Sequence, residues 1–266
     1  MRDFLGREVS LAAPAVRIVA LSPHIVENVF SAGAGSKLVG VVSHSDYPAA
    51  ATSIPEVGNY RSWGMEAIIS LQPDLVLMWA SGNGTQKLGT FEQLGIPVYV
   101  SEPRSVNDVA AAIRAIGKLA GTEAVSSAEA ERIEEQIAAL RSRYAAQNPL
   151  SVFYQVWNEP LQTLNGQHLV SSIIELCGGR NIFADEPFLA PVISLEAVLD
   201  RDPAVIVASG MHGGRPEWLD DWNAFPNLSA VKHKRLLFVN PDHIQRASAR
   251  ALLGAQTLCQ QLDSLR

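Results

Sequence analysis

The feature that most constrains this chain is a long uninterrupted stretch at residues 122–147, TEAVSSAEAERIEEQIAALRSRYAAQ. It contains no Gly or Pro, and it is rich in Ala, Glu and Arg, which favour the helix. Its larger apolar residues recur at spacings of three, four or eight, as along one face of a helix. They are Val125, Ile133, Ile137, Leu140 and Tyr144. At about 1.5 Å per residue the helix would span roughly 35 Å. It is either a strut joining two lobes or a long helix within one large domain.

An internal repeat on either side of this stretch favours the strut. Residues 65–78 read MEAIISLQPDLVLM, and residues 195–208, with a constant offset of 130, read LEAVLDRDPAVIVA. Each copy predicts a short helix that begins with a Glu-Ala pair, a Pro that ends it and a buried strand. Each is followed by a further loop, helix and strand, at 91–100 and 222–239. The expected fold is therefore duplicated.

We expect the α/β class, with two lobes that each contain a mainly parallel sheet flanked by helices, joined by one long backbone helix. The predicted boundaries are an N-terminal α/β lobe at 1–121, a linking helix at 122–147 and a C-terminal α/β lobe at 148–266. A chain of 266 residues is long enough for two lobes that each bury a core.

Composition excludes two classes of partner or location. The formal net charge is −6 and there is no basic stripe, so nucleic acid is not an expected partner. No apolar run approaches the roughly 20 residues of a membrane helix, so we expect a chain that is not membrane-embedded. The first residues, MRDFLGREVSLAAP, lack the apolar core of a signal peptide. The protein is thus either cytosolic or a processed form that begins with an added methionine.

Both cysteines, Cys177 and Cys259, fall in the second half of the chain. Their spacing alone does not say whether they are two isolated buried thiols or a disulfide. A disulfide would require an oxidising compartment.

Several aromatic, charged and histidine residues stand at the ends of predicted strands or in polar, Gly-containing loops, where they are poor core material. The segment ASGNGT at 80–85 is the best candidate for a ligand loop, because its glycines lie between the carboxyl end of a strand expected at 75–79 and the start of a helix expected near Thr85. Two facing lobes would bring such loops together across a cleft for a bulky ligand; alternatively, several of these side chains pack under loops. The candidates are His24, Tyr47, Tyr60, Trp79, Trp157, Phe188, His212, Asp242, His243 and Arg246.

Catalytic and metal-binding motifs are missing from the sequence. None of the six histidines shows the HxxxH or HExxH spacing, and there is no Cys-x-x-Cys. A single histidine that reaches a metal inside a bound ligand is the alternative, with His24 or His243 as candidates. There is no Gly-x-Ser-x-Gly elbow and no phosphate loop, and the HGG at 212–214 has no nucleophile to serve. We expect a protein without catalytic activity, without a metal site and without a cofactor.

Glu66 and Glu196 occupy matching positions in the two copies of the repeat. Each stands in the first turn of its predicted helix, where the helix dipole favours a carboxylate. The other interpretation is functional, with one exposed carboxylate per lobe docking against a partner that presents two arginines.

In order and spacing, a series of short segments resembles the periplasmic substrate-binding proteins of bacterial ABC importers, of the type whose lobes are joined by one long helix. The nearest resemblance is to members that bind cobalamin. It covers nearly the whole chain from Arg17 onward. The segments are LSP with Glu27 and Phe30 following, VGVVSHSDYP, PDLVLMW with its SGN loop, ELCGGRNIF, SLEAVL, and RASAR with AQTLC.

The resemblance implies a monomeric periplasmic protein, its signal peptide removed, that captures cobalamin or a related corrinoid and delivers it to an ABC transporter permease dimer. In that family, Glu66 and Glu196 would meet arginines of the permease, and Cys177 and Cys259 would form a disulfide. By the same resemblance Tyr47, Tyr60 and Trp79 would line the corrin site, and Asp242 and Arg246 would belong to the opposite wall.

The sequence departs from this pattern in the second lobe. Ala190 and His243 stand where tryptophan is expected, and at the start of the loop expected at 157–166, Val156 with Trp157 replaces an aromatic-Gly pair. Trp157 or Phe188 could supply the stacking surface instead. The alternative ligands within the same fold are a haem or a ferric siderophore, and from another class a tetrapyrrole metal chelatase could use a similar two-lobed body.

Overall fold

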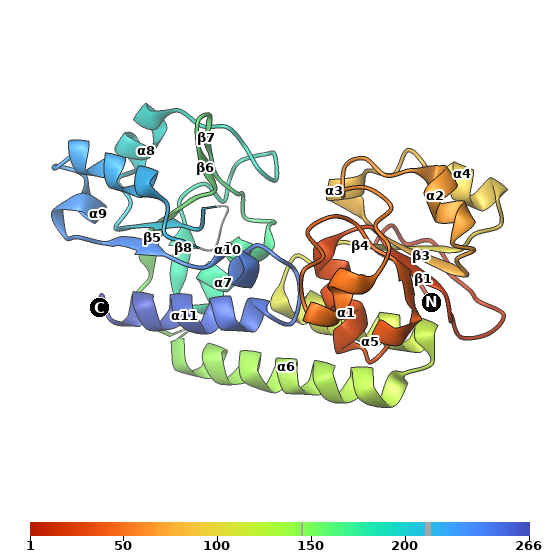
Figure 1. Ribbon diagram of the computed structural model, residues 1–266. Helices are drawn as coiled ribbons and strands as arrows, with labels where there is room; N and C mark the ends of the chain where they lie inside the picture. The colour runs from red at the N-terminus through yellow and green to blue at the C-terminus, as the bar shows by residue number, and fades with distance from the viewer. Residues whose placement is uncertain (145, 211–213) are drawn as a thin grey trace. The chain divides into compact units, whose positions relative to one another are not determined.

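The chain divides into two units, and each contains its own parallel sheet. The computed structural model describes residues 1–144, 146–210 and 214–266. Unit 1 comprises Met1–Pro103 and Asn107–Glu134, and unit 2 comprises Arg104–Val106 and Glu135–Arg266 (Figure 1). The elements up to the long helix are β1 (Ile18–Ala20), α1 (Pro23–Ser31), η1 (Gly35–Lys37), β2 (Leu38–Gly40), η2 (Ala49–Ser53), α2 (Met65–Ser70), β3 (Leu75–Trp79), α3 (Ala80–Asn83), α4 (Leu88–Gln93), β4 (Val98–Ser101) and α5 (Val106–Ala120).

Unit 1 is built on a parallel sheet with the strand order β2-β1-β3-β4. Alternate strand residues such as Val19, Val76 and Val98 pack into one core cluster with Ile68 of α2 and Phe91 of α4. Helices α1 and α5 lie on the other side of the sheet (Figure 1). Because all four strands are parallel, their carboxyl ends meet at one edge, which is where ligands bind in open α/β sheets.

Unit 2 repeats this arrangement. Its sheet has the order β10-β9-β5-β8, so β8, β5, β9 and β10 correspond to β2, β1, β3 and β4 of unit 1. This identity of strand order confirms the duplicated fold, and α8, η3 and α9 contribute side chains to the core on one face of the sheet. The elements are β5 (Leu150–Gln155), β6 (Trp157–Asn158), β7 (Leu161–Gln162), α7 (Leu169–Leu176), β8 (Gly179–Asn181), α8 (Leu195–Arg201), β9 (Val205–Ala208), η3 (Glu217–Ala224), α9 (Ser229–Lys232), β10 (Leu236–Phe238), α10 (Pro241–Ile244) and α11 (Ala251–Asp263).

The two copies of the repeat also share an unusual backbone conformation just before the repeated proline. Gln72 and Asp202 stand immediately before the repeated Pro73 and Pro203, and both adopt positive φ angles, of 47° and 38°. A left-handed residue ends each helix, and the proline that follows cannot continue it. The same local sequence therefore turns the chain from helix into buried strand in both units.

The long helix α6 runs from Glu123 to Tyr144, slightly shorter than the expected 122–147. Its buried positions include Ala130, Ile133, Ile137 and Tyr144. Val125 was wrongly assigned to this stripe, since its side chain is 53% exposed. Eight residues separate Val125 from Ile133, which at about 100° per residue places the two roughly 80° apart around the helix.

Two loops expected from the sequence contain regular structure. The segment ASGNGT does not stay a loop, because α3 follows β3 directly and the next helix begins at Leu88 rather than near Thr85. The segment 157–166, also expected as a loop, contains the antiparallel pair β6 and β7, with Asn158 opposite Leu161. In both cases the element is too short to leave a periodic signal.

Cys177 and Cys259 form a disulfide between the end of α7 and the middle of α11. Both residues are fully buried. The pairing implied by the family resemblance is therefore confirmed. Within the described residues, no helix combines the length and apolar character needed to cross a membrane.

His168 makes stability depend on pH. It is the N-cap of α7, its Nδ1 accepts the Val170 amide hydrogen at 3.1 Å, and burial lowers its pKa to about 4. The unfolded chain, with a histidine pKa of about 6.5, binds more protons than the folded chain between those values, so stability falls as pH drops through this window. We expect the part due to His168 to be about 2 kcal/mol between pH 8 and pH 4.5. His168→Asn keeps a capping oxygen without titrating, so urea unfolding at the two pH values should show a smaller difference. An equal pH-dependent loss in the variant would contradict this.

Candidate functional site

Trp79 is the last residue of β3 and lies at the carboxyl edge of the unit 1 sheet. It is held there by residues that follow β3 and by Glu102, which follows β4. Its indole Nε1 donates to the Glu102 carboxylate at 3.2 Å. Glu102, which is 9% exposed, also accepts hydrogen bonds from the amide and the hydroxyl of Ser81, at 2.6 and 2.9 Å. A Cβ on Gly82 would come 1.9 Å from the Trp79 ring, so only glycine allows the indole to lie there. The ring orientation is thus determined by its surroundings.

Asn83 ties three segments together at this edge. Its side-chain oxygen accepts the Trp79 amide hydrogen at 2.6 Å. Its Nδ2 donates to the carbonyl oxygens of Leu21, just after β1, and of Tyr60, at 2.8 and 2.6 Å. Because one amide group links β1, β3 and the loop that carries Tyr60, the aromatic residues on these segments keep a constant spacing.

Three rings form what we call the aromatic row, which consists of His24, Trp79 and Tyr60. The His24 ring meets the Trp79 ring edge-on, with centroids 5.1 Å apart, and the tilted Tyr60 ring lies 5.9 Å from Trp79. Nδ1 of His24 is hydrogen bonded to the Ser22 hydroxyl at 2.7 Å. His24 is buried, whereas Trp79 and Tyr60 are partly exposed. The row therefore presents two aromatic side chains to solvent on a rigid support.

The two remaining unit 1 candidates lie in different settings. Tyr47 is 48% exposed, in the loop that leaves the carboxyl end of β2. Glu66 is exposed in the first turn of α2, as expected from the sequence.

The two candidate aromatic residues of unit 2 lie in different segments of the chain. Trp157 begins β6, just after β5, and its Nε1 donates to the carbonyl oxygen of Glu159 at 2.9 Å. Phe188 is 73% exposed in the segment between β8 and α8. An exposed phenyl ring of this size is a candidate contact for an apolar ligand surface.

The charged candidates of unit 2 follow β10, with Asp242 and His243 on α10 and Arg246 just beyond the end of that helix. Asp242 is anchored by its amide hydrogen, which the side chain of Asn240 accepts at 2.9 Å. Its carboxylate pairs with Nε of Arg246 at 3.0 Å, one helical turn away. His243 is partly buried beside them. The expected placement of these three residues at a strand end is thus observed, while His212 lies outside the described residues.

Between Asp242 and Arg246, Gln245 anchors the helix to the sheet. Its Nε2 donates to the Ser209 hydroxyl and, at 3.4 Å, to the Tyr154 hydroxyl. Burial raises the pKa of Tyr154 to about 12, so that the phenol stays protonated.

Glu196 is exposed in the first turn of α8, where Ser194 caps the helix by accepting the Ala197 amide hydrogen at 3.1 Å. Hydrogen bonds from its own backbone amide and from the Ser194 hydroxyl lower the pKa of Glu196. The carboxylate therefore remains charged at neutral pH, as a docking contact would require.

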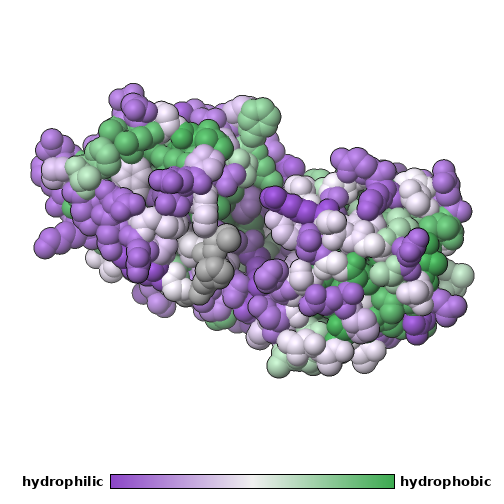
Figure 2. Space-filling model, turned by 45° about the horizontal axis from the view of Figure 1, so that its top comes forward, coloured by the Kyte–Doolittle hydropathy of each residue, from purple (hydrophilic) through white to green (hydrophobic). Residues whose placement is uncertain are grey.

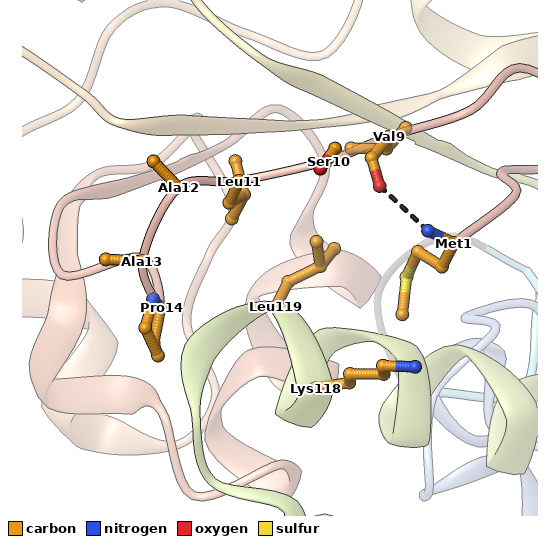
Figure 3. A pocket seen from close by; sticks show the side chains of 9 residues that line it. All are labelled: Met1, Val9, Ser10, Leu11, Ala12, Ala13, Pro14, Lys118 and Leu119. Atoms are coloured by element: carbon orange, nitrogen blue, oxygen red, sulfur yellow. Dashed lines mark hydrogen bonds between the residues drawn. The ribbon is translucent and has the colours of Figure 1, made fainter.

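Unit 1 has a pocket of about 300 Å³ away from the aromatic row. Figure 3 shows that it lies between the first residues of the chain and the end of α5, with the Met1 amino group bonded to the Val9 carbonyl at 2.9 Å. Its lining includes Pro14, which precedes β1, and Lys118. It therefore belongs to the amino edge of the sheet and not to the candidate ligand surface.

Glu102 was not identified from the sequence, because a single acidic residue after a strand carries no distinctive signal. Gly82 and Asn83 belong to the segment ASGNGT, which was predicted to be a ligand loop, but their role in holding Trp79 was not predicted. Among the described residues, no group of three or more His, Cys, Asp and Glu side chains could hold a metal ion. What the arrangement offers chemically is aromatic surface with a few fixed polar groups, which suits binding of a large ring system.

Comparison with known proteins points to one family. Residues 18–242 match the family model described as periplasmic binding protein. The vitamin B12-binding protein of Yersinia pestis (strain Pestoides F) is 37% identical over 256 residues, covering 96% of this chain and 89% of that protein. The vitamin B12-binding protein of Yersinia pseudotuberculosis serotype O:1b (strain IP 31758) shows the same identity and coverage.

Solved structures show the same fold. The periplasmic vitamin B12 binding protein BtuF of Vibrio cholerae aligns with a TM-score of 0.87 at 34% identity, covering 95% of this chain and 98% of that one. The periplasmic heme-binding protein RhuT from Roseiflexus sp. RS-1 aligns with a TM-score of 0.79 at 23% identity, covering 94% and 99%. At that identity the second likeness shows the fold alone.

Proposed function

The chain belongs to the periplasmic binding protein family, and from this premise we propose that it captures cobalamin or a related corrinoid in the periplasm and delivers it to the permease of an ABC importer. The observation that carries the proposal is the likeness, over nearly the whole chain, to proteins that bind vitamin B12, at 37% and 34% identity. The heme-binding structure RhuT shares only 23% and supports a haem ligand less well.

The aromatic row supports a flat, partly apolar ligand. Trp79 is held in one orientation by Glu102 and Gly82, so little side-chain entropy is lost when a ligand packs against it. Trp79 and Tyr60 would stack on or border the corrin ring, with Tyr47 at its periphery. His24 is 5% exposed, and we assign it to supporting Trp79 rather than to an axial contact.

The unit 2 candidates are proposed as further ligand contacts. Trp157 and Phe188 would offer aromatic surface, and Asp242, His243 and Arg246 would offer hydrogen bonds to amide groups on a corrinoid. The pair of Asp242 and Arg246 holds both side chains in a defined geometry, at 3.0 Å. The relatives named above are binding proteins, and we propose that this chain likewise binds its ligand without converting it.

Calorimetric titration of the purified protein with cyanocobalamin tests this function. We expect one-to-one binding with no change in the recovered ligand. Parallel titrations with cobinamide, haem and ferric siderophores measure selectivity. Binding of haem or of an iron chelate in the absence of corrinoid binding would overturn the assignment of the ligand.

Glu66 and Glu196 carry the proposed contact with the permease, each through one exposed carboxylate. Replacing either by Gln, in E66Q or E196Q, should weaken docking to the reconstituted permease about tenfold, because one charged hydrogen bond contributes roughly 1.5 kcal/mol. Cobalamin affinity should stay unchanged. Asp200→Asn, which removes another exposed carboxylate of α8, is the matched control. Loss of ligand affinity together with docking in E66Q and E196Q would contradict the assigned role.

A further inference from the structure

Unit 2 contains a second pocket, of about 230 Å³, that neither the ligand contacts nor the disulfide account for. We call it the η3 pocket. Its lining combines aromatic and aliphatic walls with two carboxylates and two amides, from Gln155, Asn158, Glu159, Leu161, Leu195, Trp218, Asp221, Trp222 and Phe225. Figure 2 shows hydrophobic side chains gathered on the forward face of unit 2, the side on which α8 lies in Figure 1.

The floor of the η3 pocket is rigid. Trp222 is 4% exposed, and its Nε1 donates to Oε1 of Gln155 at 2.7 Å in the interior. Its ring packs edge-on against Phe153 and tilted against Phe225, with centroids 5.7 and 6.0 Å apart. Trp218 and Phe225 are partly exposed above this floor. An aromatic surface is therefore presented without any rearrangement of the core.

The charges at the rim of the η3 pocket are unbalanced. Glu159 and Asp221 are both exposed. Across residues 1–144, 146–210 and 214–266, no ion pair involves either carboxylate, whereas the adjacent Asp220 pairs with Arg215 at 2.6 Å. Aromatic faces next to uncompensated carboxylates favour a cation on an aliphatic stem, which gains both cation–π and Coulomb attraction.

In unit 1, a comparable aromatic surface binds a cation that the chain itself supplies. Between β3 and β4, Lys87 places its Nζ 4.1 Å from the centre of the Trp63 ring, which stacks on Phe91. The corresponding connection of unit 2, between β9 and β10, contains η3 and supplies Trp218, Asp221, Trp222 and Phe225 to the η3 pocket. There the lining contains no Lys or Arg, and carboxylates take their place. A cation from outside the chain would complete it.

The pocket adjoins the proposed docking carboxylate. Leu195 lines the pocket, and Glu196 is the next residue of α8. When a partner places one cationic side chain on Glu196, the residues next to that side chain therefore come close to the η3 pocket.

We propose that the η3 pocket is a second docking element, which receives an arginine or lysine side chain of the permease. The aliphatic stem would pack on Leu161 and Leu195, and the cationic head would lie against Trp218 and the carboxylates of Glu159 and Asp221. This inference rests on the proposed delivery to a permease and adds a specific anchor to it.

The test measures docking of the full-length protein to its permease in nanodiscs, and cobalamin binding in parallel. The double variant E159Q/D221N should weaken docking about tenfold at low salt and reduce its salt dependence. Asp221→Lys, which supplies an internal cation as Lys87 does in unit 1, should weaken docking at least as much. D200N serves as the control, and cobalamin affinity should be unchanged in all variants.

Failure of this inference differs from failure of the proposed function. Unchanged docking in E159Q/D221N and D221K, while E196Q weakens it, would overturn the pocket and leave the delivery function intact. A wild-type protein that binds no corrinoid would overturn the function itself. Saturable binding of free methylguanidinium at micromolar concentration, lost in E159Q/D221N without effect on docking, would make the pocket a small-molecule site and overturn the docking role.

Discussion

Removing the disulfide, in C177A/C259A, will lower the free energy of unfolding by about 4 kcal/mol in the chain-entropy model. The bond joins residues 82 positions apart, so its loss frees a long loop in the unfolded chain. Alanine is the appropriate replacement, because both sulfurs are buried and a serine hydroxyl there would need a new partner. Thermal unfolding should occur about 10 °C lower than in the wild type.

Reductant provides the matched control for this prediction. In urea unfolding with dithiothreitol, the wild type should lose about the same free energy as the double variant, which reductant should leave unaffected. A loss below about 1 kcal/mol in C177A/C259A would show that the disulfide contributes little to stability. Cobalamin binding below the unfolding transition should persist, since neither cysteine is among the proposed ligand contacts.

Replacing Trp79 by Ala is expected to weaken cobalamin binding about 30-fold, because a fixed aromatic anchor of this kind typically contributes about 2 kcal/mol at a binding surface. Trp79→Phe keeps a ring but loses the hydrogen bond to Glu102, so we expect a smaller loss, about fivefold. Isothermal titration calorimetry measures both. Affinity of W79A within twofold of the wild type would remove Trp79 from the ligand surface.

Gly82→Ala tests the orientation of the Trp79 ring separately from its contact with the ligand. The added Cβ would come 1.9 Å from the indole, so the ring must move although every proposed ligand contact is still present. We expect about tenfold weaker binding in G82A, because the indole loses its preorganised orientation. Gly89→Ala, where an added Cβ meets nothing within 4 Å, is the matched control and should bind normally.

Local sequence predicted the elements that depend on local physics. The strand at 75–79 was placed at its observed bounds, because apolar runs and flanking breakers act within a few residues. The Glu-Ala to Pro repeat likewise predicted two copies of one supersecondary unit, and both sheets have the same strand order. Placing Trp79 at a strand end followed from the same reasoning.

The supports of the site could not be predicted in this way. Glu102, Gly82 and Asn83 act on Trp79 from the ends of two different strands, and their roles exist only because parallel strands bring those ends together. Val125 is exposed because it does not lie on the face of α6 that meets the core. Its spacing of eight residues from Ile133 was too loose a match to the helical period to assign it to that face. The η3 pocket combines α8, the β6 and β7 hairpin and η3, whose individual sequences carry no binding motif.

By itself, then, the sequence determined the α/β class, the duplication, the strand ends that carry the candidate residues and, through resemblance, the family. These follow from propensity, periodicity and short-range breakers, which act along the chain. Only the tertiary structure decided which side chains hold Trp79, how His24 is buried against it and where uncompensated carboxylates meet aromatic walls. Those outcomes depend on packing and charge pairing between segments far apart in sequence, for which local pattern carries no information.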